Sequence, residues 1–451
     1  MAFKRQATRG LERWKAKDKR KPLILRGARQ VGKTTLVGNF SKTYKHSISI
    51  NLEKPQDISF FQLHDNVQDV VDALFLSRNI PVNERESTLL FIDEIQESPR
   101  AIGLLRYFYE ELPDLHVIAA GSLLEFAMSA VKNFPVGRIE YLYIHPLNFS
   151  EFLVAIGHDQ AAKELQKIPV TKSSHQVLLD LFNTYTIIGG MPEVVSTYLR
   201  NRSVADLPIV YESIWTTYKS DIEKYTSNDT ERKIIRHIMS VAHLFVDQRI
   251  KFQKFGKSNY GSREVSEAFH NLNDAKIIQL IHPSTSIDSP IIPDIKKSPR
   301  MQFLDTGLIN YDLKIQGDML ALKDLSSAYR GKIILHMITQ ELISLNSLSY
   351  HKPNFWVREK NQSSTEVDLI YNYKNMIIPI EVKSGSYGKL RSLHQFIEVA
   401  DHPYAVRFYG GKFSVEHHET PTGRKPFILM NLPYYLGTEI EGYIEYLLDN
   451  Y

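Results

Sequence analysis

The sequence contains no cysteine and no long hydrophobic run, and both absences exclude whole classes of protein. Without cysteine the chain forms no disulfide and no zinc site built on thiolates, as is common in a reducing compartment. Its apolar stretches fall short of the roughly 20 residues that a helix needs to cross a bilayer. The amino-terminal stretch is basic and lacks the apolar segment of a secretory signal peptide. We therefore expect a cytoplasmic protein that has no membrane partner.

The composition is that of an ordinary globular protein. Charged residues make up 24% of the 451 residues and hydrophobic residues 43%, and the net charge of +4 is too small to select a partner. The length favours roughly two to four domains, because a single core rarely grows this large. The strongest local bias is basic and lies in the first 21 residues. It suits either a phosphate-binding surface or a solvated amphipathic helix with Leu11 and Trp14 turned inward, and we favour the helix.

The clearest motif is a glycine-rich stretch that joins an apolar run to the start of a helix. The candidate nucleotide-binding residues are Gly27, Ala28, Arg29, Gln30, Val31, Gly32, Lys33, Thr34 and Thr35. Glycines in this pattern let successive N–H groups and a helix N-terminus face a phosphate chain. Lys33 would reach the outer phosphates, and the Thr34 hydroxyl would bind Mg²⁺.

A second motif supports the first. The apolar residues 88–92 predict a strand, and Asp93 and Glu94 follow it about 60 residues after the glycine-rich stretch. Asp93 would hold Mg²⁺, and Glu94 would polarise the attacking water as a general base. Two adjacent carboxylates at a buried strand end would be poorly solvated without a cation. The two motifs together predict hydrolysis of ATP or GTP.

The order of the remaining elements predicts a parallel sheet covered by helices. Further strands are expected at residues 46–51, 116–120 and 136–147, with helices between them. Ser122 follows the fourth strand, where a polar residue senses the γ-phosphate in P-loop ATPases that have an extra strand beside the phosphate loop. Ser122 also suits the N-cap of a helix at residues 123–129, and both roles are compatible. The ligand is expected at the carboxyl ends of the strands.

Seven motifs, taken in order, resemble those of a family of prokaryotic AAA-type predicted ATPases. They lie at residues 27–35, 93–96, 120–122, 136–138, 146–152, 189–192 and 305–308, so the resemblance covers nearly the whole chain. The family has a P-loop fold of the ASCE, AAA-like type and a C-terminal domain similar to PD-(D/E)xK nucleases, and it implies ATP as the nucleotide. Arg138 is a candidate for stabilising transition-state charge, in cis or from a neighbouring subunit, and a surface ion pair is the alternative. A homo-oligomer stays open.

We expect four domains. They are an AAA-like P-loop domain (1–157), a helical lid (158–207), a winged-helix-like domain (208–315) and an α/β nuclease-like domain (316–451). The third carries helices at 230–245 and 263–272 and strands at 276–281 and 300–304, which is the order of a winged helix. Its second helix carries Arg263 but also Glu264 and Glu267, so double-stranded DNA and a protein partner stay open as alternatives. A basic rim is expected from Lys251, Lys254, Lys257, Lys296, Lys297 and Arg300.

The last region carries the arrangement of a PD-(D/E)xK site. Asp368 lies in a predicted strand at 366–371, and Glu381 and Lys383 lie in another at 376–383. The two carboxylates could share a Mg²⁺, and Lys383, on the same face as Glu381, could activate a water. Glu341 and Gln395 are candidate additions from helices, while an ordinary strand-edge ion pair is the alternative reading of Glu381 and Lys383. His417 and His418 read as surface residues of a charged loop.

These patterns support two hypotheses. The first is an ATPase that uses Mg²⁺ and couples its nucleotide state to DNA binding or processing by the C-terminal domains. The second is an ATP-dependent switch or scaffold for a protein partner, with a degenerate and inactive nuclease-like domain.

Overall fold

The computed structural model describes residues 3–122, 124, 134–224, 226, 228–316, 327–348, 351–358, 365–384 and 390–451. The chain forms two compact units. The first comprises residues 1–146, 274–276 and 346–350, and the second comprises residues 147–273, 277–345 and 351–451. We expected the first boundary at residue 157, but the first unit ends at Pro146. The next residues pack in the second unit, where the Leu147 N–H donates to the Gly190 carbonyl at 2.7 Å.

The sheet of the first unit is entirely parallel and has the order β2-β3-β4-β1-β5. Its strands are β1 (Leu23–Arg26), β2 (His46–Asn51), β3 (Thr88–Asp93), β4 (His116–Ala120) and β5 (Glu140–Tyr143). Every residue of β3 and β4 is buried, as expected for central strands that are covered on both faces. The predicted parallel α/β fold of a P-loop protein is confirmed, with β4 inserted between β1 and β3.

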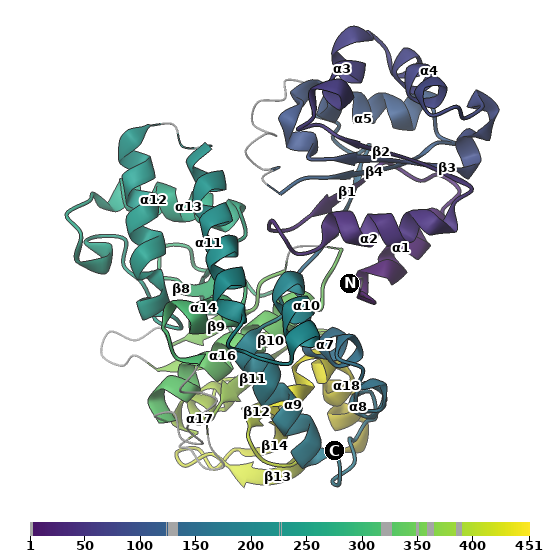
Figure 1. Ribbon diagram of the computed structural model, residues 1–451. Coiled ribbons are helices and arrows are strands. Elements are labelled where there is room, and N and C mark those ends of the chain that lie inside the picture. Colours follow the sequence, from purple (N-terminus) through teal and green to yellow (C-terminus); the bar gives the residue numbers. More distant parts are fainter. Residues whose placement is uncertain are drawn as a thin grey trace. The chain divides into compact units, whose positions relative to one another are not determined.

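Helices cover both faces of this sheet, with α1 and α2 on one side and α3, α4 and α5 on the other (Figure 1). They are α1 (Ala7–Lys15), α2 (Lys33–Phe40), α3 (Pro55–Leu63), α4 (Val67–Ser77) and α5 (Pro99–Glu111), with 3₁₀ turns η1 (Ser41–Thr43), η2 (Val82–Ser87) and η3 (Ile95–Glu97). The N-terminal basic stretch forms α1 and buries Leu11 and Trp14, which confirms the amphipathic helix. The start of α5 is set by Ser98, whose hydroxyl accepts from the Ala101 N–H, and by a proline at the first helical position.

The second unit begins with helices that pack around residues far away in the sequence. Its helices are α7 (Phe149–Ala155), α8 (Asp159–Leu165), α9 (His175–Ile188), α10 (Pro192–Asn201), α11 (Leu207–Lys224), α12 (Asp229–Val241), α13 (Ser262–Asp274), α14 (Thr306–Asp312), α16 (Ser327–Ser344), α17 (Arg391–Ile397) and α18 (Ile440–Asn450), with η4 (Ala242–Phe245), η5 (Phe255–Lys257) and η6 (Tyr434–Glu439). The expected lid at 158–207 corresponds to α8, α9 and α10. The apolar face of α9 is covered within the second unit, where Phe182 contacts the rings of Phe149 and Tyr434. That face is therefore used for internal packing.

Three of the family-type motifs meet in a buried polar cluster of this unit. Asp305 caps α14 by accepting from the Gly307 N–H at 3.0 Å, and its other oxygen accepts from the Gly190 N–H at 2.7 Å. A Cβ at Gly189 would lie 2.1 Å from the Asp305 carboxylate, so only glycine allows the chain to come this close. The motifs at 146–152, 189–192 and 305–308 therefore join three helices. The stretch 189–192 is a packed junction.

The region 208–315 contains α11, α12 and α13 and then a two-stranded antiparallel sheet. Its strands are β6 (Ile278–Ile281) and β8 (Arg300–Phe303), paired so that Ile278 faces Phe303. The predicted order of helix, helix and hairpin is thus observed. Between these strands lies β7 (Pro283–Ser284), which pairs with a strand of the larger sheet. The expected domains 208–315 and 316–451 consequently share one sheet and do not separate at residue 315.

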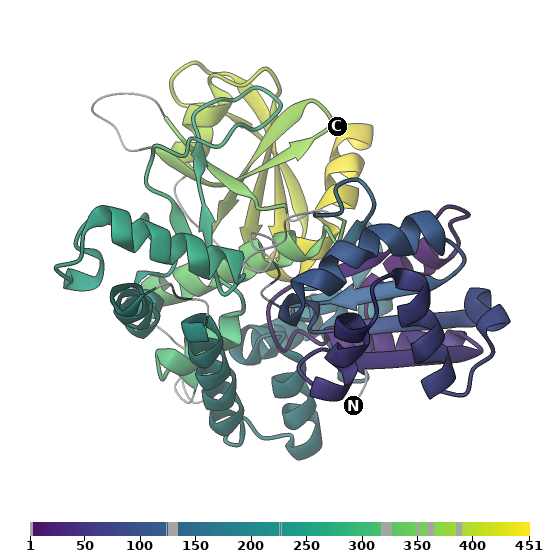
Figure 2. The same ribbon diagram turned by 90° about the horizontal axis from the view of Figure 1, so that it is seen from above.

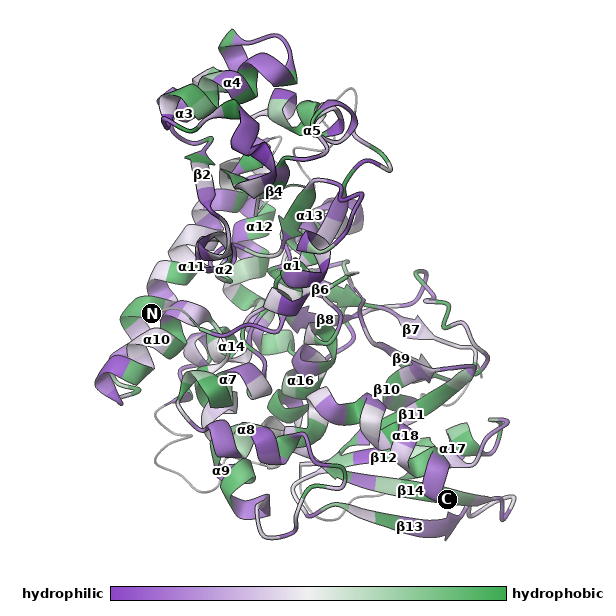
Figure 3. Cartoon of the chain, turned by 90° about the vertical axis from the view of Figure 1, so that its right-hand side faces the viewer, coloured by the Kyte–Doolittle hydropathy of each residue, from purple (hydrophilic) through white to green (hydrophobic). Residues whose placement is uncertain are grey.

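The larger sheet has seven strands in the order β13-β14-β12-β11-β10-β9-β7. Its other strands are β9 (Asn354–Val357), β10 (Glu366–Tyr373), β11 (Met376–Val382), β12 (Tyr404–Tyr409), β13 (Ser414–Glu419) and β14 (Pro426–Pro433). Strands β9, β10 and β11 form an antiparallel meander, and α17 then connects β11 to the parallel strand β12. Strand β11 is mainly hydrophobic (Figure 3), and α18 lies beside the sheet (Figure 2). The outer strand β13 carries His417 and His418, which we had expected in a loop.

Candidate functional site

The loop between β1 and α2 has the backbone geometry of a phosphate loop. Gly27 and Gly32 adopt φ values of +142° and +94°, which side-chain-bearing residues rarely reach. A Cβ at Gly27 would lie 2.2 Å from the Ile144 carbonyl oxygen, so the loop also needs glycine for close approach to the segment after β5. Helix α2 begins at Lys33, which leaves the N–H groups of its first turn available to an anion.

Two cationic side chains hold this loop together. The Lys33 ammonium donates to the carbonyls of Gly27 and Ala28 at 2.9 and 2.8 Å and is almost fully buried. Arg5 donates to the Val31 carbonyl at 3.0 Å and to the His145 carbonyl at 2.5 Å. The sequence places Arg5 only within a basic stretch and contains no signal that it braces the loop.

Thr34 and Asp93 come together at the carboxyl edge of the sheet. The Thr34 hydroxyl donates to the Asp93 carboxylate at 2.8 Å, although the two residues lie on different elements. Burial raises the pKa of Asp93, and the hydrogen bond from Thr34 only partly opposes this shift. A bound cation would stabilise the charged form of the Asp93 carboxylate. Hydroxyl and carboxylate oxygens are ligands that Mg²⁺ prefers. The two side chains therefore fit the metal ion that the sequence predicts for them.

Glu94 follows Asp93 in a left-handed conformation, with φ of 51°, at the end of β3. Its carboxylate accepts from the side-chain amide of Gln96 at 2.6 Å. Gln96 is buried, and its own carbonyl oxygen has no hydrogen-bond partner among the described residues. We did not assign a role to Gln96 from the sequence, although it ends the Asp-Glu-Ile-Gln motif.

Ser122 follows β4. In the sheet, β4 lies between β1, which leads into the phosphate loop, and β3, which ends at Asp93. The Ser122 hydroxyl oxygen is buried and, within the ranges that the structure describes, has no hydrogen-bond partner. The neighbouring Gly121 lies against the unpaired Gln96 oxygen, which a Cβ there would approach to 2.5 Å. Buried polar atoms without partners are uncommon. A phosphate oxygen would accept from the Ser122 hydroxyl, whereas the Gln96 carbonyl oxygen needs a donor such as water. Most of the helix that Ser122 was expected to cap lies outside the described residues.

Arg138 does not join this group in its own chain. It precedes β5, whose first residue Glu140 pairs with Leu23, the first residue of β1. Arg138 therefore lies near the amino-terminal edge of the parallel sheet, whereas the phosphate loop follows the carboxyl end of β1. Its half-exposed guanidinium pairs with Glu110 at 3.1 Å. A catalytic role in cis is wrong for this geometry, and a role towards a neighbouring subunit stays a prediction.

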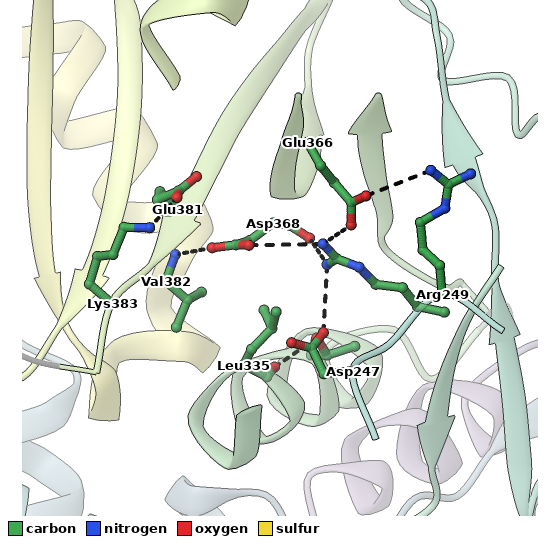
Figure 4. Close-up of polar contacts among 10 residues, drawn as sticks. Asp247, Arg249, Leu335, Glu366, Asp368, Glu381, Val382 and Lys383 are labelled. Atoms are coloured by element: carbon green, nitrogen blue, oxygen red, sulfur yellow. Dashed lines mark hydrogen bonds and ion pairs between the residues drawn. The ribbon is translucent and has the colours of Figure 1, made fainter. Parts of the chain in front are cut away.

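Asp368, Glu381 and Lys383 cluster in the second unit (Figure 4). Leu369 of β10 pairs with Ile380 of β11, so Asp368 and Glu381 lie one step further at adjacent positions. The Asp368 carboxylate accepts from the Val382 N–H at 2.8 Å, and the Lys383 ammonium donates to Glu381. The register between β9 and β10 shifts between Val367 and Ile370, the stretch that contains Asp368, as at a β-bulge.

The electrostatics of this cluster are dominated by burial. Burial and the neighbouring Asp368 carboxylate raise the pKa of Glu381, and one Glu381 oxygen has no hydrogen-bond partner among the described residues. Burial raises the pKa of Asp247 to about 7, and the guanidinium of Arg300 opposes that shift. Across the described part of the chain, no group of three or more His, Asp or Glu side chains has the arrangement of a metal site. A metal ion would depend on a rearrangement of these side chains.

Arg300, which we expected on a basic rim, points into this acidic cluster. It donates to the Asp368 main-chain carbonyl at 2.8 Å and to the Glu366 carboxylate, and it lies 3.7 Å from an oxygen of Asp247. The sequence contains no signal for this position, because the contacts join β8 to strands more than 60 residues away.

The two helix residues suggested for this site have hydrogen-bond partners outside it. Glu341 of α16 accepts from the Phe149 N–H and from the Tyr185 hydroxyl at 2.8 Å, and burial raises its pKa to about 8. It therefore serves the N-terminus of α7 and not the Asp368 pair. Gln395 of α17 accepts from Arg358 at 3.0 Å.

Comparison with known proteins supports the first unit's assignment. Residues 19–153 match a family model described as an AAA domain. Residues 179–318 and 330–433 match two others, each a domain of unknown function (DUF8612 and DUF4143). No curated protein matches the chain.

Two solved structures were also compared. Cdc6p from Pyrobaculum aerophilum is 12% identical, aligns over 71% of this chain and 97% of its own, and gives a TM-score of 0.25. A RuvB variant from Thermotoga maritima is 17% identical over 64% of this chain and 90% of its own, with a TM-score of 0.26. TM-scores this low do not support a fold assignment. The assignment of the first unit rests on the family model, the sheet order and the loop geometry. In the described ranges no helix combines the length and the apolar character that crossing a bilayer requires. Residues 19–153 are therefore similar to an AAA domain, and the sheet and loop that they form are those of a P-loop fold.

Proposed function

We propose that the first unit binds ATP with Mg²⁺ and hydrolyses it. The observation that carries this proposal is the 2.8 Å contact between the Thr34 hydroxyl and the Asp93 carboxylate, beside a glycine-shaped loop and a neighbouring glutamate. The loop N–H groups and Lys33 would bind the phosphates, and Thr34 and Asp93 would hold the metal ion, which withdraws charge from the phosphates.

The remaining side chains would act on the attacking water. Glu94 would accept a proton from that water, because its carboxylate is the acidic group next to Asp93 at the strand end. Gln96 supports Glu94 through its 2.6 Å hydrogen bond. Ser122, with its unpaired hydroxyl at the end of β4, would contact the terminal phosphate.

ATP turnover with point variants tests this proposal. Lys33→Ala should abolish nucleotide binding, whereas Lys42→Ala, an exposed lysine after α2, should bind as the wild type does. Glu94→Gln should bind ATP and lose at least a hundredfold in turnover, because proton transfer by a positioned base contributes about 10²–10⁴-fold. Glu97→Gln, an exposed glutamate three residues further, is the matched control. An unchanged rate in Glu94→Gln removes Glu94 as the base.

For the second unit we propose DNA as the partner, with the Asp368, Glu381 and Lys383 cluster as a PD-(D/E)xK-like site. The adjacency of Asp368 and Glu381 on β10 and β11 supports this proposal. It predicts that the protein retains duplex DNA at low salt and that DNA changes the rate of ATP turnover. If neither effect is observed, the DNA role fails.

The alternative is an ATP-dependent switch or scaffold for a protein partner. One observation favours it. On α13, the exposed Arg263 pairs with Glu267 at 3.1 Å on its own helix, which leaves this helix a weak binder of phosphate. Under this alternative, ATP turnover proceeds without any response to DNA.

A further inference from the structure

One guanidinium contacts three of the acidic residues in the cluster around Asp368. Arg300 is the first residue of β8, and its two terminal nitrogens reach Glu366, Asp247 and both the carbonyl and the carboxylate of Asp368, the last at 3.9 Å. These acidic residues come from two segments, because Asp247 follows η4 and both Glu366 and Asp368 lie at the start of β10.

Arg300 is fixed by its surroundings. Its side chain is only 11% exposed, and the guanidinium lies 4.4 Å from the centre of the Phe355 ring on β9. A guanidinium nitrogen of Arg249 lies 3.9 Å from a carboxylate oxygen of Glu366, and the Arg249 main chain pairs with that of Arg300. Arg300 is thus a buried and tightly held cation.

The charges show what Arg300 replaces. Four carboxylates, those of Asp247, Glu366, Asp368 and Glu381, are in direct contact with three cationic side chains, those of Arg249, Arg300 and Lys383. The formal charge of this group is minus one. Without Arg300 it becomes minus two, which is the charge that one divalent cation compensates. A buried cluster with that excess would be strongly unfavourable unless a cation entered it.

We propose that Arg300 is an internal lock on the Asp368–Glu381 site, supplying the positive charge that a divalent metal ion would otherwise bring. The metal ion binds only when β8 withdraws the guanidinium. This inference rests on the proposed PD-(D/E)xK-like role of Asp368, Glu381 and Lys383.

The rest of the site argues for a lock over a degenerate site. Asp368 is held by the Val382 N–H, Lys383 contacts Glu381, and one Glu381 oxygen has no hydrogen-bond partner within the described ranges. These features do not involve Arg300. The arginine comes from β8, which pairs with β6 in a separate two-stranded sheet and with Arg249 at one position, so withdrawal of its side chain leaves the ladder between β10 and β11 intact.

The test is Mn²⁺ binding and plasmid nicking by the full chain. All proteins carry Asp93→Asn in the binding experiment, which removes the proposed metal ligand of the first unit. Arg300→Gln should bind Mn²⁺ at least tenfold more tightly than its parent and should nick plasmid DNA in Mg²⁺, where the parent does not. Asp368→Ala added to Arg300→Gln should remove both gains. Arg424→Gln, at an exposed arginine of the second unit between β13 and β14, is the matched control and should behave as the parent does.

A second variant covers the case in which Arg300→Gln does not fold. Phe355→Leu removes the ring that lies 4.4 Å from the Arg300 guanidinium and keeps all four carboxylates and Lys383, so it should loosen Arg300 and raise Mn²⁺ affinity in the same direction. If the folded variants bind Mn²⁺ no better than the parent, the lock is overturned. It is equally overturned if the wild type already nicks DNA as fast as Arg300→Gln.

Failure of the proposed function gives other results than failure of the lock. Tighter Mn²⁺ binding without nicking supports the lock and removes DNA cleavage from the second unit. ATP turnover is measured separately on proteins that keep Asp93, and its absence in every protein would refute the ATPase assignment without affecting the Mn²⁺ result.

Discussion

Replacing Gly190 with alanine should destabilise the second unit by about 2–4 kcal/mol. A Cβ at this position would lie 2.0 Å from the Leu147 carbonyl oxygen, where ordinary contacts begin near 3.4 Å. The two segments would have to separate by about 1.4 Å. That movement stretches the hydrogen bond from the Leu147 N–H to the Gly190 carbonyl and the one from the Gly190 N–H to Asp305, both at 2.7 Å.

The magnitude follows from those two bonds. A neutral buried hydrogen bond contributes about 1 kcal/mol and one to a carboxylate about 1.5–3 kcal/mol. Asp305 is fully buried, and burial already raises its pKa to about 6, so loss of a donor leaves that carboxylate poorly compensated. Alanine also restricts the unfolded chain, which returns about 0.4–1 kcal/mol. The net loss is therefore about 2–4 kcal/mol.

Urea unfolding followed by tryptophan fluorescence measures this loss. In a Trp14→Phe background the remaining tryptophans, Trp215 and Trp356, both report on the second unit. Gly331, within α16, provides the matched control, because a Cβ there would lie at an ordinary 3.8 Å from Ser384. Gly331→Ala should stabilise the protein by up to about 1 kcal/mol. A Gly190→Ala protein within 1 kcal/mol of the wild type would refute the close packing of this junction.

Three further outcomes are expected. Arg5→Ala should raise the KM for ATP several-fold with a smaller change in kcat, because the variant loosens the loop at the Val31 carbonyl, and steady-state kinetics with Arg5→Lys as comparison measures this. Gln96→Ala should lower kcat more than KM, since it frees Glu94, and an unchanged kcat would mean that the 2.6 Å contact has no role in turnover. Burial lowers the pKa of His336 to about 3, so below its ordinary value of 6.5 the unfolded chain binds one more proton than the folded one. The free energy of unfolding should therefore fall by about 1.4 kcal/mol for each unit by which the pH falls over that window. Urea titrations at pH 7 and 4.5 should show that His336→Gln lacks this contribution to the pH dependence of stability.

The first unit was largely predictable from the sequence because its signals are local. An apolar strand, a glycine-rich turn and a helix start follow one another within residues 23–40, and Asp93 ends a continuous apolar strand. The parallel sheet brings such strand ends to one edge, so the approach of Thr34 to Asp93 follows from the fold. Gln96 was missed because a buried glutamine has no pattern of its own.

The second unit was less predictable because its contacts join distant segments. Glu341 is bound by residues more than 150 positions earlier, and Arg300 by residues more than 50 positions away on either side. A charged residue in isolation reads as exposed, which led us to place Arg300 on a basic rim. Strand β13 escaped notice because polar residues occupy both of its faces, which hides the period of two.

The short strand β7 decides how this protein can be divided for study. It lies in the segment before residue 315, yet it forms one edge of the seven-stranded sheet by pairing with β9. A fragment that begins after residue 315 would leave β9 with unpaired main-chain groups on its outer side. Exposed strands of this kind pair with other molecules and aggregate. Fragments intended for crystallisation or binding assays should therefore start at residue 147, where the second unit begins.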